Sequence, residues 1–245
     1  MNDPLLELHL NKLKLTAIAS QYKNIIDKNT KEDIVTILTK LFEYEVQVRE
    51  DRAIERKLRG ANFPKIKTID SFDFTKLPNL DKQKILNFTN CEFIEKTENI
   101  IMLGNAGTGK THLAVALGVA ACQKNISVYF TSAAKLANDL MEARDELSLS
   151  KLHNKLSKHK LLIIDEIGYV PLSATGAELM YDIINQRYEV NSLIMTSNLE
   201  FSDWIQVFKS DKLTAALLDR ITHYSNIIEM NGDSYRFSNS IAKRK

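Results

Sequence analysis

Cysteine is scarce in this chain, which has only Cys91 and Cys122 among its 245 residues. The two are far apart, with no C-x-x-C pair and no Cys/His cluster beside either of them. Neither a disulfide framework nor a structural zinc site is therefore supported. Isolated thiols of this kind are most simply buried side chains in a reducing compartment. We expect a cytoplasmic protein with two free cysteines.

The chain also lacks long apolar runs and a strong net charge. No run approaches the ~18 residues of a membrane span, and the start MNDPLLELHL has no basic segment typical of a signal peptide. No membrane partner is therefore expected. Lys and Arg number 33 against 31 Asp and Glu, so any nucleic-acid footprint must be local. The length suits one α/β domain with a substantial core plus a smaller appendage.

Residues 104–111 read GNAGTGKT and directly follow the apolar run 100–103. They match the phosphate-loop pattern G-x-x-x-x-G-K-[ST] at every fixed position. Its glycines let the backbone wrap around a polyphosphate, and the helix that starts near Gly109 directs its positive end at the same anion. Lys110 can then reach the β- and γ-phosphates, and the Thr111 hydroxyl can bind Mg²⁺. The alternative is a glycine-rich turn that matches by chance.

An acidic pair follows a second apolar run, 161–164. Four consecutive apolar residues are typical of a central parallel strand that is buried on both faces. Asp165, at the carboxyl end of this strand, would hold the Mg²⁺ shell. Glu166 would orient and deprotonate the water that attacks the γ-phosphate. In the simpler alternative, Glu166 is an ordinary surface acid at a strand end.

A third strand is expected over 193–197, and it ends in Asn198. A polar amide there can hydrogen-bond the attacking water or the γ-phosphate, as the sensor 1 residue of AAA+ ATPases does. Taken alone, a Thr-Ser-Asn strand exit is also a common turn. The two preceding motifs favour the functional interpretation.

The N-terminal part has helical periodicity. Asp3-Pro4 resembles a helix start, and Leu6, Leu10, Leu13 and Ala17 then form one apolar stripe. A second, long helix is predicted from about residue 34 until Gly60 and Pro64 end it. We predict a helical hairpin over 1–60, a connector over 61–98, and an ATPase core over 99–245.

Two segments are locally basic. Residues 49–67 hold seven Lys/Arg against three acids, and residues 151–160 hold four lysines and two histidines without an acid. Either segment can contact phosphates without reading sequence. The alternative is a solvated helix face, the commoner meaning of a charge run. The DNA-contacting residues that we predict are Arg49, Arg52, Arg56, Arg59, Lys151 and Lys155.

Arg220 lies near the end of a predicted helix, in the segment ALLDRI. An arginine there can reach the γ-phosphate of a neighbouring subunit and neutralise charge in the transition state. The alternative is a local ion pair with Asp219 or Glu229.

Nearly the whole chain resembles the IstB family, the ATP-binding helper proteins that insertion sequences encode beside their transposase. The resemblance rests on GNAGTGKTHLAVALG, LLIIDEIGYVPLS, IMTSNLEFSDW and LLDRITHYSNIIEMNGDSYRFS, and it extends to EVQVREDRAIERKLRGANFP and IDSFDF. The segments after Asp165-Glu166 and around Trp204 are the most specific of these. The family belongs to the AAA+ initiator clade, together with the DnaC-like helicase loaders.

The resemblance implies a three-layer P-loop NTPase of AAA+ type with a central parallel sheet, preceded by a small helical domain. It implies ATP and Mg²⁺ as cofactors, with Glu166, Asn198 and Arg220 catalytic and with Thr111 and Asp165 as metal ligands. It also implies an ATP-dependent oligomer that binds duplex DNA and assists a cognate transposase. The nucleotide-binding residues that it implies are Gly104, Asn105, Ala106, Gly107, Thr108, Gly109, Lys110, Thr111 and His112.

The chain departs from the wider AAA+ pattern at its end. Only 25 residues follow Arg220, too few for the helical lid that usually carries a sensor 2 arginine. Arg236 stands where such an arginine would be sought. With a reduced or absent lid, the adenine pocket must be covered from elsewhere, and Phe72 and Phe74 of the connector are our candidates.

Two other functions compete with the transposition helper. A DnaC-like loader would share every ATPase residue but would grip a replicative helicase and prefer single-stranded DNA. The scarcity of aromatic residues near both basic segments disfavours this, because single-strand binding uses base stacking. A small-molecule P-loop kinase would need an arginine-bearing closing lid instead of an Asp-Glu pair and a sensor asparagine.

Overall fold

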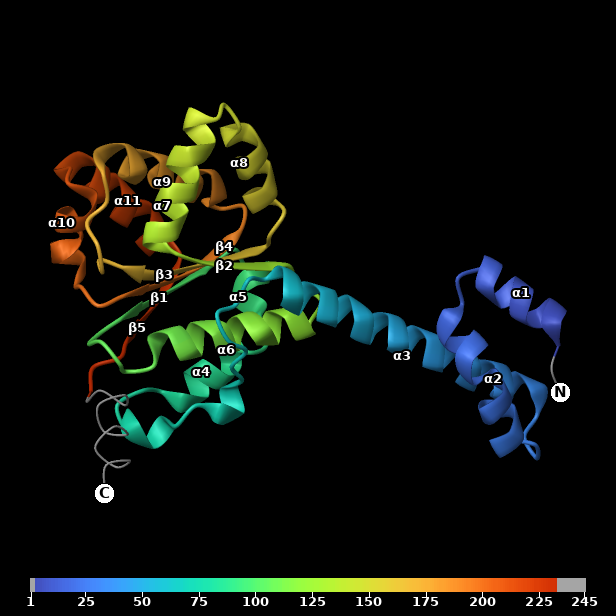
Figure 1. Ribbon diagram of the computed structural model, residues 1–245. Helices are drawn as coiled ribbons and strands as arrows, with labels where there is room; N and C mark the ends of the chain where they lie inside the picture. Colours follow the sequence, from blue (N-terminus) through green and yellow to red (C-terminus); the bar gives the residue numbers. More distant parts are fainter. Residues whose placement is uncertain (1–2, 233–245) are drawn as a thin grey trace, which may run out of the picture. The chain divides into compact units, whose positions relative to one another are not determined.

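The computed structural model describes residues 3–232. Its contacts divide the chain into two compact units, Met1–Arg56 and Lys57–Lys245, and the division falls inside the long helix α3 (Ile34–Gly60). Each unit is described by itself (Figure 1). Every helix of the described part is too short or too polar to cross a lipid bilayer.

Three helices build the first unit, where we predicted two. Asp3 caps α1 (Pro4–Lys12) as expected, by accepting from the amides of Leu5 and Leu6. The apolar stripe does not continue as one helix to Ala17, because Lys14 turns into the left-handed region at φ 57° and the chain restarts as α2 (Thr16–Lys28). Leu13, a member of the predicted stripe, is consequently two-thirds exposed.

A carboxylate from α3 supplies the cap that α2 lacks. The N-cap residue of α2, Leu15, has no side chain able to accept a hydrogen bond. Glu45, which is buried, accepts the amides of Ala17 and Ile18, both at 2.9 Å. Arg49 then pairs with the other oxygen of Glu45 at 2.8 Å. This junction holds together a core that is small, comprising Leu10, Ile18, Tyr22 and Leu41.

One face of α3 leaves apolar side chains exposed. They recur at helical spacing and surround a shallow groove along the first half of the helix. The exposed fractions of Ile34, Val35, Leu38, Phe42 and Val46 range from 47% to 76%. Exposed apolar patches of this kind are typical of association surfaces.

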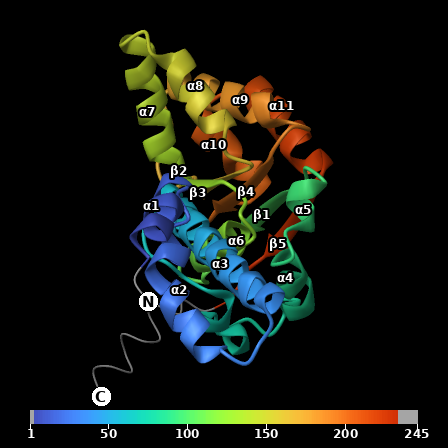
Figure 2. The ribbon, with the colours of Figure 1, turned by 90° about the vertical axis from the view of Figure 1, so that its right-hand side faces the viewer.

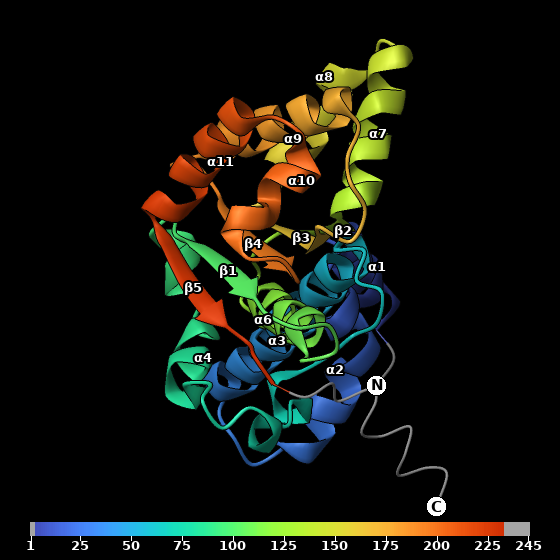
Figure 3. The ribbon, with the colours of Figure 1, turned by 90° about the vertical axis from the view of Figure 1, so that its left-hand side faces the viewer.

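The second unit is built on a five-stranded sheet in which every pair is parallel. Its order is β2-β3-β4-β1-β5, which Figure 3 shows from the β5 edge. The strands at 100–103, 161–164 and 193–197 that we predicted are all present. The bounds of the strands are β1 (Asn99–Leu103), β2 (Val128–Ser132), β3 (Leu161–Ile167), β4 (Ser192–Ser197) and β5 (Ser225–Glu229).

Helices cover both faces of this sheet and complete a three-layer α/β fold, as predicted (Figures 1 and 2). One face carries α4 (Lys82–Phe88), α5 (Glu92–Glu95) and α6 (Lys110–Gln123). The other carries α7 (Ala133–Asp145), α8 (Leu149–Ser157), α9 (Ala174–Arg187), α10 (Trp204–Phe208) and α11 (Asp211–His223). Three short 3₁₀ turns are η1 (Ile69–Ser71), η2 (Phe74–Lys76) and η3 (Phe201–Asp203).

The segment 61–98, which we predicted as a connector, packs into the core of the second unit. Ala61 is fully buried, and its carbonyl accepts the amide of Phe130 on the edge strand β2 at 2.8 Å. Leu77, Ile85 and Phe93 join the apolar cluster between α6 and the sheet. Both cysteines lie in this cluster, and burial raises the pKa of the Cys122 thiol to about 11.

We expect Glu45→Gln to loosen the first unit, because the variant removes the charge that two amides and a guanidinium bind. The expected loss is about 1–2 kcal/mol, measured as an approximately tenfold faster hydrogen exchange of the Ala17 and Ile18 amides. Glu43→Gln is the matched control, since Glu43 lies exposed on the same helix. Equal exchange in the two variants would contradict the capping role.

The same cap has a pH dependence. Burial alone would raise the pKa of the Glu45 carboxyl, but the amides of Ile18 and Ala17 and the Arg49 guanidinium outweigh burial and lower it. A lowered carboxyl pKa stabilises the fold above the unfolded value of about 4.3, and this contribution is lost as the pH falls through the folded pKa. Protection of α2 should therefore fall on acidification in the parent protein and less in Glu45→Gln.

Candidate functional site

The glycine-rich loop has the backbone that phosphate binding requires. It joins β1 to α6, and Gly104, Gly107 and Gly109 all have positive φ, at 143°, 84° and 96°. A side chain at Gly104 would lie 2.3 Å from the carbonyl oxygen of Met230. Lys110 is buried, and its ammonium donates to the carbonyls of Gly104 and Asn105 at 2.5 and 2.7 Å. The loop is thus a preformed cradle with its lysine inside.

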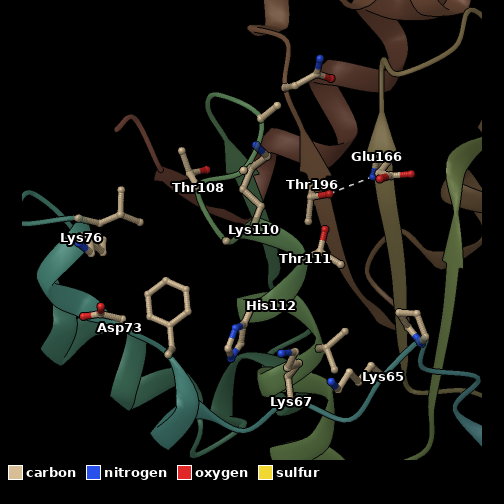
Figure 4. Close-up of a pocket in the computed structure, with 18 of the residues that line it drawn as sticks. Lys65, Lys67, Asp73, Lys76, Thr108, Lys110, Thr111, His112, Glu166 and Thr196 are labelled. Atoms are coloured by element: carbon tan, nitrogen blue, oxygen red, sulfur yellow. Dashed lines mark hydrogen bonds between the residues drawn. The ribbon is translucent and has the colours of Figure 1, made fainter. Parts of the chain in front are cut away.

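A cavity of about 540 Å³ opens beside this loop, a size typical of small-ligand sites. Three parts of the second unit line it: the loop and the start of α6, the carboxyl ends of β3 and β4, and the segment 64–77 (Figure 4). Predicted residues in the lining are Ala106, Gly107, Thr108, Gly109, Lys110, Thr111, His112, Glu166 and Asn198.

Asp165 joins the loop to the strand ends. The Thr111 hydroxyl, at the start of α6, donates to its carboxylate at 2.9 and 3.0 Å. From the other side, the Thr196 hydroxyl of β4 donates to the same carboxylate at 2.5 Å. Asp165 itself is 4% exposed. Two residues that lie 54 positions apart in the sequence, and that we predicted as ligands of a metal ion, are therefore in direct contact.

Glu166 lines the cavity near the end of β3, and its backbone is held in an uncommon conformation. Its φ is 61°, a left-handed value that a non-glycine residue adopts at a cost. Its amide donates to the Thr196 hydroxyl at 3.0 Å, the dashed line in Figure 4. Its side chain is exposed, as is that of Asn198 at the end of β4. The cavity lining brings both together with Lys110.

The residues around Asp165 fit a magnesium ion. Mg²⁺ takes hard oxygen ligands and is usually held by one or two carboxylates together with phosphates and water. Thr111 and Asp165 supply one hydroxyl and one carboxylate at the edge of the phosphate cradle. Within residues 3–232 no group of three or more His, Cys, Asp or Glu side chains forms a cage for a metal. A metal here would thus depend on a nucleotide for further ligands.

The segment 64–77 contributes residues to the cavity that we did not predict for this site. Lys65 and Lys67 line it together with Ser71, Asp73 and Lys76. The two lysines belong to the first basic segment, which we had considered only as a phosphate contact for DNA. The clustering of Lys and Arg in this segment indicated anion binding, but it did not indicate which anion.

Phe72 lies against the phosphate loop, whereas Phe74 packs on Phe72. A side chain added at Gly109 would lie 2.9 Å from the Phe72 ring, and the rings of Phe72 and Phe74 meet edge to face at 4.9 Å. The imidazole of His112 contacts the Phe72 ring edge and lies 3.0 Å from the Ser71 hydroxyl. Burial lowers the pKa of His112. Phe72 lines the cavity, as our adenine-covering hypothesis requires.

Arg220 is remote from the cavity of its own chain. It lies on α11, and it is not among the described residues that line the cavity. Its guanidinium covers the Tyr181 ring at 5.1 Å, and one of its nitrogens is buried without a hydrogen-bond partner in the described structure. Among residues 3–232 it pairs with neither Asp219 nor Glu229, so the local ion pair that we considered is not formed. Arg236 lies outside the described residues.

Some of the predicted DNA contacts already have partners within the fold. Besides its pair with Glu45, Arg49 donates to the carbonyl of Lys14 at 2.7 Å, and Arg52 donates to the Thr16 hydroxyl at 3.0 Å. Both arginines thus help to hold α2 on α3.

The other predicted contacts are exposed. Arg56 and Arg59 are exposed on α3, and Lys151 and Lys155 are exposed on α8. The Lys155 ammonium lies 5.1 Å from the centre of the Tyr129 ring. Contact of these side chains with DNA remains a prediction.

A parallel five-stranded sheet with a phosphate loop after β1 and an acidic pair near the carboxyl end of β3 defines a P-loop NTPase of AAA+ type. The chain belongs to the family of IstB-like ATP binding proteins, whose model matches residues 8–243. It is 39% identical over 240 residues to a protein named as the ATP-binding protein of insertion sequence IS232 in Bacillus thuringiensis, covering 97% of this chain and 96% of that protein. It is 36% identical to the corresponding IS21 protein of Pseudomonas aeruginosa, covering 94% and 88%.

Solved structures show the same fold. DnaA from Aquifex aeolicus with bound AMPPCP superposes with a TM-score of 0.60 at 21% identity, over 74% of this chain and 55% of that one. The DnaC helicase loader superposes with a TM-score of 0.53 at 24% identity, over 60% of this chain and 86% of that one.

We expect Gly109→Ala to weaken binding of a fluorescent ATP analogue at least about tenfold, because the new side chain is strained at this φ and meets the Phe72 ring. Gly60→Ala is the matched control, since no atom lies within 4 Å of the added carbon there. Fluorescence of Trp204, the single tryptophan, reports that the second unit remains folded. Equal affinities in the two variants would argue against this cradle as the phosphate site.

Proposed function

We propose that this chain is an ATPase that assembles on duplex DNA with ATP and assists a transposase in target selection and insertion. The observation that carries the ATPase part is the convergence of Thr111, Asp165 and Glu166 beside a preformed phosphate cradle. The insertion-sequence relatives, which match nearly the full length, support the transposition part. The helicase-loader likeness covers less of the chain.

The residues divide the chemistry among themselves. The loop amides and Lys110 would bind the polyphosphate, and Thr111 and Asp165 would hold Mg²⁺, which would supply charge neutralisation on the phosphate oxygens. Glu166 accepts a proton from the attacking water, and Asn198 orients that water or the γ-phosphate. Each of these groups lines the cavity or contacts a residue that does.

Completion of the site would require a second subunit. Because Arg220 does not line its own cavity, we assign it to the γ-phosphate of a neighbour, where a guanidinium stabilises transition-state charge. The exposed apolar face of α3 offers a further surface for association.

The first test is binding of the full chain to labelled duplex and single-stranded DNA of equal length, with ATP, ADP or AMPPCP. Particle size is followed in the same samples. We expect large complexes on duplex DNA with triphosphate alone. Preference for single strands, or binding only in the presence of a helicase, would favour the loader.

Charge removal on α8 tests where DNA binds. Lys151→Gln with Lys155→Gln should weaken duplex binding equally for different sequences and lower the salt slope by about two, because each lost phosphate contact contributes about 0.9. Arg144→Gln is the matched control, since Arg144 is exposed at the end of α7 and, within residues 3–232, pairs only with the neighbouring Asp145. An unchanged salt slope would remove α8 from the DNA-binding surface.

Mixing variants tests whether the active site is shared. Glu166→Gln and Arg220→Ala should each be nearly inactive alone. An equal mixture should recover about one quarter of parent activity, because one in four random neighbour pairs then contains both residues. A mixture of Glu166→Gln with the double variant has no complete site and serves as the control. Absence of recovery in the first mixture would contradict the trans assignment.

A further inference from the structure

Thr196 contacts the acidic pair but has no role among the nucleotide and metal ligands proposed above. It lies on β4, two residues before Asn198, and is 1% exposed. Its hydroxyl contacts both members of the acidic pair. It donates to the Asp165 carboxylate at 2.5 Å and accepts the Glu166 amide at 3.0 Å.

The directions of these two hydrogen bonds are fixed by the hydrogens and lone pairs that each group carries. A threonine hydroxyl has one hydrogen and two acceptor lone pairs. An ionised carboxylate can only accept, and a backbone amide can only donate. The single hydroxyl hydrogen must therefore point at Asp165, and a lone pair must face Glu166. One buried group thereby sets the orientation of both residues.

The amide that Thr196 accepts has left the regular sheet. The pairing of β3 with β4 shifts register between Ile164 and Ile167, and Glu166 stands inside this irregularity with φ 61°. An amide in a bulge loses its ladder partner, and an unpaired amide is costly in a buried setting. The Thr196 hydroxyl replaces that partner, so it stabilises the backbone conformation in which Glu166 lines the cavity.

We propose that Thr196 is a positioning residue for hydrolysis, which couples the sensor strand β4 to the metal ligand and to the catalytic base. This inference rests on the proposed ATPase function. Thr196 acts through Asp165 and Glu166. A displacement of β4 that accompanies γ-phosphate contact at Asn198 would reach the Glu166 amide through this hydroxyl.

The test compares Thr196→Val, which keeps the shape and removes the hydroxyl, with Thr196→Ser, which keeps the hydroxyl. We expect kcat for ATP hydrolysis to fall about 10- to 100-fold in the valine variant, as misplacement of a catalytic group typically produces. KM should change by less than about threefold, because the phosphate cradle is untouched. The serine variant should retain parent kcat within about threefold.

A second readout does not depend on turnover. Amide hydrogen exchange of Glu166, measured by NMR, should accelerate at least about tenfold in Thr196→Val and stay near the parent rate in Thr196→Ser. Thr214→Val is the matched control for loss of a buried threonine hydroxyl, because among the described residues the Thr214 hydroxyl bonds only the carbonyl of Ser210, the N-cap residue of α11. It should leave kcat and the exchange of Glu166 unchanged.

The results of these experiments distinguish failure of the Thr196 inference from failure of the proposed ATPase function. Parent-like kcat or parent-like Glu166 exchange in Thr196→Val overturns the inference while the ATPase assignment stands. Loss of nucleotide binding or of thermal stability in Thr196→Val well beyond that in Thr214→Val also overturns it, since Thr196 would then be a general structural residue. A parent protein that does not hydrolyse ATP in any assembly state refutes both.

Discussion

The buried Asp165 carboxylate is the interaction on which the candidate site depends. It accepts hydroxyl donors from α6 and from β4, and in this way it joins the phosphate loop to the carboxyl ends of two central strands. A buried carboxylate is tolerated only where donors satisfy it. Thr111 and Thr196 meet that requirement here. The same donors fix the geometry that a metal ion and a nucleotide would use.

The parallel sheet makes this convergence possible. Loops that follow parallel strands emerge at the same edge, so β1, β3 and β4 deliver the glycine loop, the acidic pair and Asn198 to one place. Positive φ at the loop glycines turns the chain after β1, and positive φ at Glu166 bends it near the end of β3. The cost of this conformation at Glu166 falls at the cavity, where the neighbouring strands of the sheet support it.

Sequence reasoning predicted what is encoded locally. The three strands, the phosphate loop and the acidic pair follow from apolar runs and fixed spacings, and the structure contains all of them in one three-layer fold. Sequence reasoning failed where a residue that is distant in the sequence determines the local structure. The break at Lys14 could not be foreseen, because the cap that permits α2 to restart comes from Glu45, 28 residues beyond Ala17. For the same reason, the sequence alone does not indicate that Lys65 lies at the cavity and not on an outer surface.

Arg220 differs from these cases, because the partner proposed for it belongs to another subunit. The fold of one chain therefore does not contain that partner. Its position on α11 removes it from its own cavity, and its stacking on Tyr181 orients the guanidinium without satisfying it. A guanidinium is well suited to bind an anionic group such as a phosphate. If that partner is the nucleotide of a neighbour, then hydrolysis cannot precede assembly. ATP would join subunits at the face that carries Arg220. Loss of ATP would weaken the contact between subunits at that face.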